Sequence, residues 1–348
     1  MTVIGAGAIG GTTGVRLHRA GHDVTLVDRD PEHVATINRD GYRISGLVDY
    51  TERVPAITAD DLPAHVAERG PLRMVVLSVK AMDTEAAASM IHPHLAPDGF
   101  IVSFQNGLNE PVIAGVVGPE RTIGAFIHFG ADLVEPGRVV LANQLRTYVS
   151  ELDGQRTNRI DQVAATLSAV TETVVTDNLD GYLWGKLGYA ALAFVVSSVD
   201  APIDEVVMDP DARVAIRAVV AEVMDVARAQ GIRPEETHGF DSRWFARDNP
   251  DRIAATDALF DRWGEEYRTL IKRHMGIHRD IKYKRRRTEV DFQVGPVVER
   301  GRQFGVPTPA CALLLDGIHA VETRQRPHDW TTIRELAAAI RAADPTAV

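Results

Sequence analysis

The chain begins with residues whose spacing could hold a dinucleotide. The apolar stretch Met1–Ile4 runs straight into the pattern Gly5-x-Gly7-x-x-Gly10. In such a turn the first glycine permits a tight bend, the second lets the backbone approach a pyrophosphate, and the third lets a helix pack close to the strand. An acid, Asp28, stands about 20 residues further on, where it would bind a ribose 2′-hydroxyl. The residues expected to contact this cofactor are Gly5, Gly7, Ala8, Ile9, Gly10 and Asp28.

A lysine inside an apolar stretch is the second candidate for chemistry. Residues 182–199 are almost wholly apolar, which is typical of a helix buried on all sides, and Lys186 is the one charge among them. Desolvation lowers the pKa of a buried lysine towards neutrality, which suits a proton donor near pH 7. The alternative is a lysine that extends along the helix to reach solvent.

The elements that must position these residues can be read from the same pattern. A helix is expected over 11–20 and a second strand over 24–27, which completes a strand, helix and strand unit. A glycine turn with an unrelated surface acid is the alternative. A helix should begin at Asp30-Pro31, and a hairpin is expected over 42–54.

Two further buried strands end in polar residues. The apolar runs 72–80 and 100–104 read as strands covered on both faces, as in a parallel sheet, and Lys80 and Asn106 stand at their carboxyl ends. Open α/β sheets bind ligands at that edge, so both residues are candidates for one shared crevice with the glycine turn. A solvent-facing lysine and an ordinary Asn-Gly turn are the alternatives. Residues 124–130 and 139–141 are expected to form additional strands.

Length and pattern predict two domains of different class. The 348 residues exceed one ordinary hydrophobic core. We expect a Rossmann, doubly wound α/β domain over 1–177 and an all-α domain over 178–348. In the second domain, Asp209-Pro210 should open a helix that Gly231 ends, and another helix is expected over 254–275.

Charge and cysteine content bound the partners. The formal charge of −10 favours neither nucleic acid nor an anionic membrane surface, so the basic stretch 282–287 is interpreted as a solvated face or a patch near cofactor phosphates. The single cysteine, Cys311, excludes a disulfide within the chain and is interpreted as a packed thiol, which favours a cytoplasmic location. No signal peptide and no membrane-spanning run is expected. His274 and His278 are four residues apart, but no third ligand stands nearby in the sequence, so no metal site is predicted.

Together these stretches resemble the ketopantoate reductase (2-dehydropantoate 2-reductase) family over nearly the whole chain. The resemblance rests on the glycine turn, on Ser78-Val79-Lys80, Gln105-Asn106-Gly107, Glu135-Pro136-Gly137, Trp184-Gly185-Lys186-Leu187, Thr288-Glu289-Val290-Asp291 and Gly305-Val306-Pro307-Thr308-Pro309. It implies a Rossmann domain followed by a helical domain, with the active site in the cleft between them.

The resemblance also implies roles for individual residues. Lys186 matches the general acid that protonates the ketone oxygen as hydride arrives from the nicotinamide. Glu289 matches the acid that binds the substrate and helps to place that lysine. Lys80 and Asn106 match residues that contact the cofactor and the substrate. A carboxylate near the lysine would raise its pKa and so oppose the effect of desolvation.

Several positions depart from the family pattern. Ala190 and Phe194 stand where the family usually places asparagines, and the serine that grips the substrate carboxylate is missing near Gly276. Losing matched hydrogen-bond partners should strongly weaken a small polar keto acid. We therefore expect Ala190 and Phe194 to line a pocket for a bulkier or less polar ketone or 2-keto acid than ketopantoate.

The cofactor and the reaction direction are the remaining expectations. Arg29 could hold the 2′-phosphate of NADP(H), but Asp28 beside it would repel a phosphate, so NAD(H) is expected to be preferred, with NADP(H) as the alternative. The predicted activity is that of an NAD(P)-dependent oxidoreductase acting on CH–OH groups. The alternatives are an NAD-dependent D-2-hydroxyacid dehydrogenase, a strict 2-dehydropantoate 2-reductase of pantothenate synthesis, and a dinucleotide-sensing protein without turnover. The long apolar helices favour a homodimer.

Overall fold

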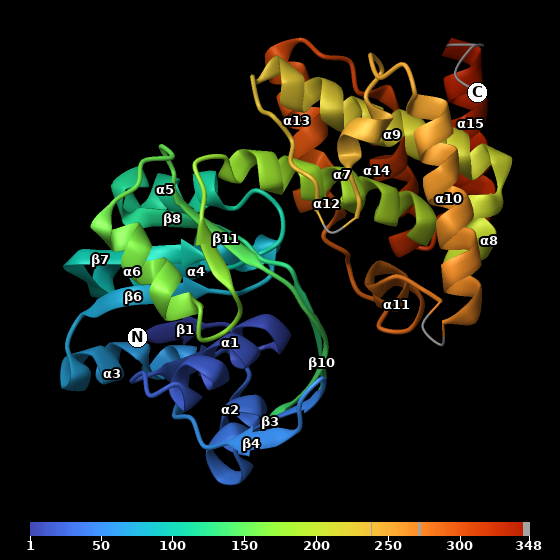
Figure 1. Ribbon diagram of the computed structural model, residues 1–348. Helices are drawn as coiled ribbons and strands as arrows, with labels where there is room; N and C mark the ends of the chain where they lie inside the picture. Colours follow the sequence, from blue (N-terminus) through green and yellow to red (C-terminus); the bar gives the residue numbers. More distant parts are fainter. Residues whose placement is uncertain (238, 271–272, 344–348) are drawn as a thin grey trace. The chain divides into compact units, whose positions relative to one another are not determined.

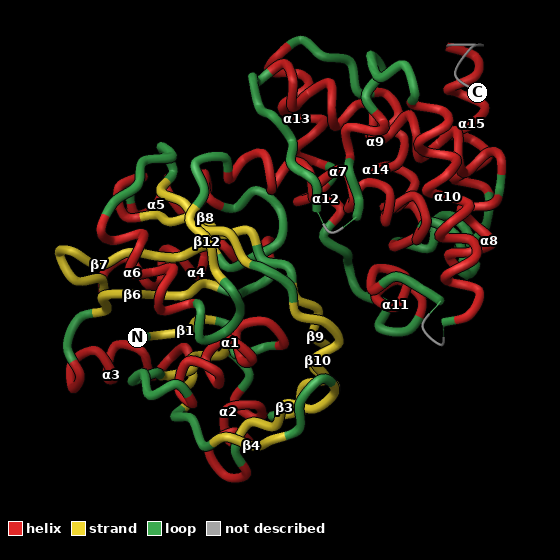
Figure 2. The backbone as a smooth tube through the Cα atoms, viewed as in Figure 1, coloured by secondary structure: helices red, strands yellow, loops and turns green. Residues whose placement is uncertain are grey.

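The computed structural model describes residues 1–237, 239–270 and 273–343. The chain divides into two compact units, Met1–Leu179 and Asp180–Val348. This division lies two residues beyond the boundary expected from the sequence. Strands occur only in the first unit among the described residues, and the second is built of helices (Figure 2).

The first unit contains an eight-stranded sheet in the order β12-β11-β8-β7-β6-β1-β2-β5 (Figure 1). All neighbouring pairs are parallel except β8 with β11. Its strands are β1 (Thr2–Ile4), β2 (Thr25–Asp28), β5 (Ala56–Thr58), β6 (Leu72–Leu77), β7 (Leu95–Ser103), β8 (Thr122–Phe126), β11 (Thr147–Glu151) and β12 (Thr173–Val175). Its helices are α1 (Ala8–Arg19), α2 (Pro31–Asp40), α3 (Leu62–Arg69), α4 (Thr84–Ile91), α5 (Glu110–Val117) and α6 (Asn158–Leu167).

The central strands are buried on both faces, as their continuous apolar runs predict. Successive residues belong to two different hydrophobic clusters, with Val3 and Val76 in one and Ile4 and Val75 in the other. Because side chains alternate along a strand, the two clusters lie on opposite faces of the sheet. The doubly wound α/β architecture expected from the sequence is therefore confirmed.

A second sheet of four strands accompanies the first, in the order β4-β3-β10-β9. Its strands are β3 (Tyr42–Gly46), β4 (Tyr50–Glu52), β9 (Phe129–Glu135) and β10 (Arg138–Gln144). The β3–β4 hairpin agrees with the expectation for residues 42–54. The expectation of one strand over 124–130 was wrong, because the chain leaves β8 at Phe126 and enters the other sheet at Phe129. A continuous apolar run does not reveal a change of sheet.

The regular secondary structure of the second unit is helical among its described residues. Its helices are α7 (Leu179–Ser197), α8 (Ile203–Met208), α9 (Pro210–Ala229), α10 (Arg252–Thr269), α11 (Gly276–Lys282), α12 (Val290–Gln293), α13 (Gly295–Phe304), α14 (Pro309–Glu322) and α15 (Thr331–Ala343). Asp209 caps α9 as expected, since its carboxylate accepts hydrogen bonds from the backbone N–H groups of Asp211 and Ala212, both at 3.0 Å. The helix expected over 254–275 was too long, because α10 ends at Thr269.

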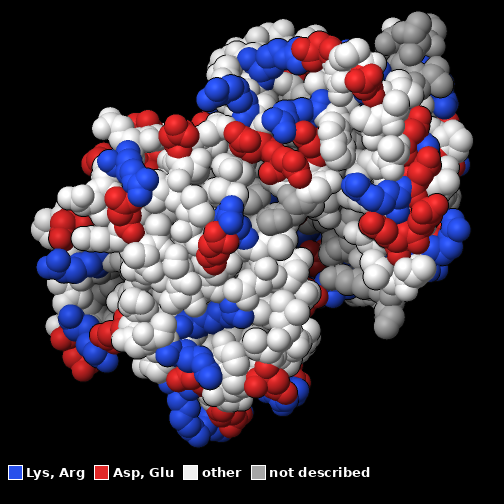
Figure 3. Space-filling view, in the orientation of Figure 1, with Lys and Arg blue, Asp and Glu red and all other residues white. Residues whose placement is uncertain are grey.

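The surface carries both signs of charge. On the face that Figure 3 shows, acidic and basic side chains are interspersed on each unit. Two members of the basic stretch 282–287 are ion-paired, since Lys282 lies 2.6 Å from Asp200 and Arg286 lies 2.9 Å from Asp280. In the described part of the chain, no helix combines the length and the apolar character that a membrane crossing requires.

Candidate active site

The expected cofactor residues of the first unit meet at one edge of the sheet. Strands β2, β1, β6 and β7 are neighbouring and parallel, so their carboxyl ends share that edge. Asp28 ends β2, the glycine turn follows β1, Lys80 follows β6 and Asn106 follows β7. The chain moves outward in opposite directions from β1 and β6, which makes their junction the switch point where such sheets bind ligands.

The glycine turn has the geometry that a pyrophosphate requires. Gly5 has φ +90°, which other residues rarely adopt. A Cβ on Gly10 would collide with the Gly5 carbonyl oxygen, whereas a Cβ on Gly7 would meet no atom within 4 Å. Gly7 is the N-cap residue of α1, and among the described residues no side-chain hydrogen bond caps this helix. The backbone N–H groups of Ala8 and Ile9 therefore lie at the helix start, which is where anions bind. These residues fit a dinucleotide phosphate.

Asp28 joins the turn to the start of α2. Its carboxylate accepts hydrogen bonds from the backbone N–H of Ala6 at 2.8 Å and from that of Asp30 at 3.0 Å. A carboxylate has about four lone-pair sites, so it retains capacity for ribose hydroxyls. Arg29 is exposed and lies 3.2 Å from Asp83, which partly neutralises its charge.

Two buried side chains hold the carbonyl groups of the same turn, and sequence reasoning missed both. The Tyr42 hydroxyl donates to the carbonyl oxygen of Gly7 at 2.9 Å and lies 3.2 Å from that of Ala6. The His33 ring accepts the backbone N–H of Gly137 at Nδ1 (3.0 Å), which places its proton on Nε2, 2.9 Å from the Ala6 carbonyl oxygen. We call Asp28, His33 and Tyr42 the turn clasp.

The clasp connects the turn to both sheets. His33 lies on α2, Tyr42 begins β3, and Gly137 lies in the turn between β9 and β10. Burial raises the pKa of the Tyr42 phenol, and the nearby Asp28 carboxylate adds to this, so the hydroxyl stays a donor. The sequence carried no signal for these bonds, because they join segments that only the tertiary fold brings together.

The loops that carry Lys80 and Asn106 are braced against each other. Buried Gln105 donates its amide N–H to the carbonyl oxygen of Val79 at 2.9 Å, which ties the end of β7 to that of β6. The amide of Asn109 donates to the carbonyl oxygen of Asn106 at 2.7 Å. Lys80 is exposed and Asn106 is half-buried. Both expected residues therefore lie on loops with fixed backbones at the same edge.

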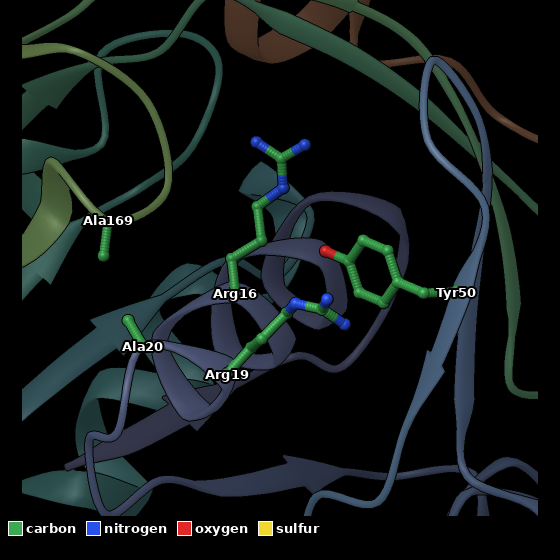
Figure 4. Close-up of a pocket in the computed structure, with 5 residues that line it drawn as sticks. All are labelled: Arg16, Arg19, Ala20, Tyr50 and Ala169. Carbon is green, nitrogen blue, oxygen red and sulfur yellow. The ribbon is translucent and has the colours of Figure 1, made fainter.

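A separate pocket of 290 Å³ lies at the other end of α1 and does not suit the dinucleotide. Figure 4 shows Arg19 directed at the ring of Tyr50, and its guanidinium carbon lies 4.3 Å from the ring centre. Arg16 donates to the carbonyl oxygen of Val170 at 2.6 Å. Both cations are thus engaged in structural contacts, and a helix carboxyl end disfavours an anion.

In the second unit, Lys186 lies within α7 and is half-buried as a residue, among neighbours that are mostly buried. Burial lowers the pKa of its ammonium to about 8, and the Glu289 carboxylate acts in the opposite direction. Glu289 caps α12 and is half-buried. Both opposing effects expected from the sequence are present, and desolvation is the larger.

Glycines explain how a loop reaches the helix that carries the lysine. A Cβ on Gly185 would collide with the carbonyl oxygen of Glu235, and the N–H of Glu235 donates to the carbonyl oxygen of Gly181 at 2.9 Å. A Cβ on Gly188 would lie 2.7 Å from Cβ of Ser242. The glycine that precedes Lys186 is therefore required by packing.

The positions that depart from the family pattern are apolar in the fold as well. Phe194 is fully buried and Ala190 is 8% exposed. Gly276 begins α11. His274 precedes α11 and His278 lies within it, and the two rings stack with centres 4.2 Å apart.

Comparisons with known proteins agree with this architecture. Residues 1–154 match the family model described as Ketopantoate reductase PanE/ApbA, and residues 178–322 match that of its C-terminal part. The 2-dehydropantoate 2-reductase of Archaeoglobus fulgidus is 27% identical over 92% of this chain and 97% of its own. That of Pyrococcus abyssi is 28% identical over 93% and 99%.

Solved structures share the fold over a similar extent. A PanE/ApbA family ketopantoate reductase from Ralstonia eutropha JMP134 is 27% identical, with a TM-score of 0.75 over 93% of this chain and 99% of its own. The ternary structure of D-mandelate dehydrogenase with NADH and anilino(oxo)acetate is 23% identical, with a TM-score of 0.77 over the same shares, and shows the likeness of fold. The chain belongs to the ketopantoate reductase family and is a nicotinamide-dependent oxidoreductase acting on CH–OH groups.

Proposed function

We infer that this protein interconverts a ketone or 2-keto acid and the corresponding secondary alcohol, with Lys186 as the residue that carries the proton. The observation that supports this most directly is the pKa of Lys186, lowered to about 8 by burial in α7. A group with a pKa near the working pH serves as both acid and base. Glu289, whose charge acts on the same ammonium, is proposed to bind the substrate and to position the lysine.

The proton and the hydride balance in this scheme. A nicotinamide, when bound, would supply the hydride that the carbonyl carbon receives. The Lys186 ammonium donates a proton to the carbonyl oxygen, and the C=O group becomes CH–OH. In the reverse direction the neutral amine of Lys186 takes the hydroxyl proton, and the hydride would pass from the alcohol carbon to the oxidised nicotinamide. This reversibility favours a D-2-hydroxyacid dehydrogenase as the second candidate.

The substrate is proposed to be bulkier or less polar than ketopantoate. The support is the apolar character of Ala190 and Phe194 and the absence of a hydroxyl at Gly276. Because Phe194 is fully buried, we expect it to act through packing, whereas Ala190 retains some exposed surface. A test compares kcat/KM for ketopantoate with that for 2-oxo-2-phenylacetate. A strong preference for ketopantoate would overturn the proposal and favour a strict 2-dehydropantoate 2-reductase.

NAD(H) is proposed as the preferred cofactor. A 2′-phosphate would stand beside the Asp28 carboxylate, and the nearby charge of Arg29 is partly neutralised by Asp83 at 3.2 Å. The dissociation constants of NADH and NADPH decide this preference, and tighter binding of NADPH would refute it. The roles of Lys80 and Asn106 in contacting cofactor and substrate are part of the same proposal.

Replacement of Lys186 separates an enzyme from a dinucleotide sensor. Lys186→Ala should abolish turnover while NADH still binds, because the glycine turn lies in the other unit. If the wild type turns over no ketone or alcohol in a broad screen with NADH and NAD⁺, the sensor gains support. The homodimer and the cytoplasmic location expected from the sequence stay predictions, and light scattering tests the former.

A further inference from the structure

A group of three potential metal ligands lies in the second unit, apart from the residues assigned to the reaction. Asp200 follows α7, His274 precedes α11, and His278 lies within α11. One ligand atom from each side chain comes within 4.8 Å of the others. The sequence predicted no metal because no third ligand stands near the histidines, and the fold supplies Asp200 as that ligand. We propose that Asp200, His274 and His278 form a binding site for a divalent metal of the zinc class.

The chemistry of the three side chains favours zinc. Two imidazole nitrogens and one carboxylate oxygen are a common protein ligand set for Zn²⁺, with water in the fourth position. Imidazole suits borderline metals, whereas Mg²⁺ and Ca²⁺ prefer oxygen ligands alone. Zn–N and Zn–O bonds of about 2.0–2.2 Å require the three groups to draw together by a small movement. The exposed carboxylate of Asp200 leaves the group open to ions from solvent.

The buried histidine presents one of its two nitrogens to the carboxylate of the group. The His278 side chain is 3% exposed, and its Nε2 lies 2.9 Å from Oδ1 of Asp200. Its other nitrogen, Nδ1, is buried without a hydrogen-bond partner among the described residues. Because Asp200 lies at Nε2, that nitrogen is the ligand atom of His278 in the three-residue site, and the metal takes the place of the hydrogen bond between them.

The Lys282 ammonium already places a positive charge beside the carboxylate of Asp200. Lys282 Nζ lies 2.8 Å from Oδ1 and 2.6 Å from Oδ2 of Asp200, so its ammonium already neutralises this carboxylate. A metal ion must displace the ammonium before it can bind Asp200. Lys282 therefore competes with the metal, and its removal should strengthen metal binding. A purely structural ion-pair cluster predicts no such gain.

The site would join two segments that flank the proposed catalytic residues. Asp200 lies three residues beyond the end of α7, the helix that carries Lys186, and α11 precedes Glu289 in the chain. His328 stands beside the group, with its ring centre 5.3 Å from that of His278, but its Nε2 is bound to the carbonyl oxygen of Ser197 at 2.8 Å. His328 is therefore not counted among the ligands, and a metal held by the other three residues would join the segment that follows α7 to α11.

The test is a titration of the untagged, EDTA-treated full chain with ZnCl₂ by calorimetry, repeated with CoCl₂ to record the visible absorption of tetrahedral Co²⁺. We expect one equivalent to bind. The variant His274→Ala should bind more than about tenfold more weakly, while Lys282→Gln should bind more tightly than the wild type. His319→Ala removes the histidine of another His–Asp pair, with Asp291 at 2.8 Å, and should bind like the wild type.

Two results would overturn the proposal. One is the absence of saturable binding at one equivalent in the wild type. The other is a zinc affinity that Lys282→Gln leaves unchanged or weakens. Because Lys282 is exposed, this variant should fold even if His274→Ala does not. Neither result depends on turnover, so they leave the proposed reaction untouched.

Discussion

Replacing Lys186 with methionine should reveal what the buried ammonium costs the fold. Lowering its pKa from 10.5 to about 8 means that the protonated side chain destabilises the folded state. At about 1.36 kcal/mol per pH unit the cost is about 3 kcal/mol. It is fully present below pH 8 and is relieved as the pH rises from 8 to 10.5, because over that range the unfolded chain binds more protons than the folded one. Methionine keeps the apolar stem and carries no charge.

Tryptophan fluorescence isolates the relevant unit. All four tryptophans, at positions 184, 244, 263 and 330, lie in the second unit, so their emission during urea unfolding reports on that unit alone. The variant's advantage in free energy of unfolding should shrink by about 3 kcal/mol between pH 7 and pH 10.5. At about 1–3 kcal/mol per molar urea, this is a change of about 1–3 M in the difference between midpoints. The charge of Glu289 is already included in the Lys186 pKa of about 8, so losing its partner adds no further pH dependence.

An exposed lysine provides the matched control. Asp200 raises the pKa of Lys282, so Lys282→Met should lose stability relative to the wild type at neutral pH and should not show the trend of the Lys186 variant. A difference between wild type and Lys186→Met that stays flat from pH 7 to 10.5 would refute the argument. In that event the ammonium is solvated, and its assignment as the proton donor loses its physical basis.

The remaining predictions concern the pair of Lys186 and Glu289 and the glycine turn. The kcat/KM for ketone reduction should fall above about pH 8 as Lys186 loses its proton. Glu289→Gln should move that fall to lower pH, and an unmoved pH profile would contradict the pairing of Glu289 with Lys186. Gly7→Ala should leave thermal stability unchanged, because its Cβ meets only open space, but it should weaken NADH binding at least about tenfold. Gly10→Ala should destabilise the first unit, because its Cβ would collide with the Gly5 carbonyl oxygen. Equal losses of stability in the two variants would refute the distinction. Tyr42→Phe should weaken NADH binding several-fold, about 1 kcal/mol, because it releases the Gly7 carbonyl. Fluorescence titration measures this, and an unchanged dissociation constant would exclude a role for the Tyr42 hydroxyl in binding.

The parts of the first unit that could be predicted are those set by short segments. The glycine turn, the acid at the end of β2 and the buried strands β6 and β7 follow from local patterns of glycine and apolar residues. The second sheet could not be predicted, because β3 pairs in parallel with β10, so that Ile44 stands opposite Val139. Nothing in either segment alone indicates its partner.

The candidate site divides in the same way. Lys186 was recognisable as an anomaly in an apolar stretch, but two opposing effects left the size and direction of its pKa change open. Only the fold shows that desolvation exceeds the attraction of Glu289. The turn clasp and the group around Asp200 were invisible, since each joins residues from separate elements.

The cost of Lys186 bears on whether the protein catalyses a reaction. The proposed dinucleotide site lies at the turn of the first unit, where Gly7 leaves open space and Asp28 accepts a hydrogen bond from the backbone of Ala6. None of this needs a charge in α7, and at neutral pH the protonated form of Lys186 costs the fold about 3 kcal/mol relative to its neutral form. A sensor would gain nothing in return for that loss of stability. A proton donor would, because the desolvation that destabilises the fold also brings the pKa of the ammonium to about 8, where it can both give and take a proton.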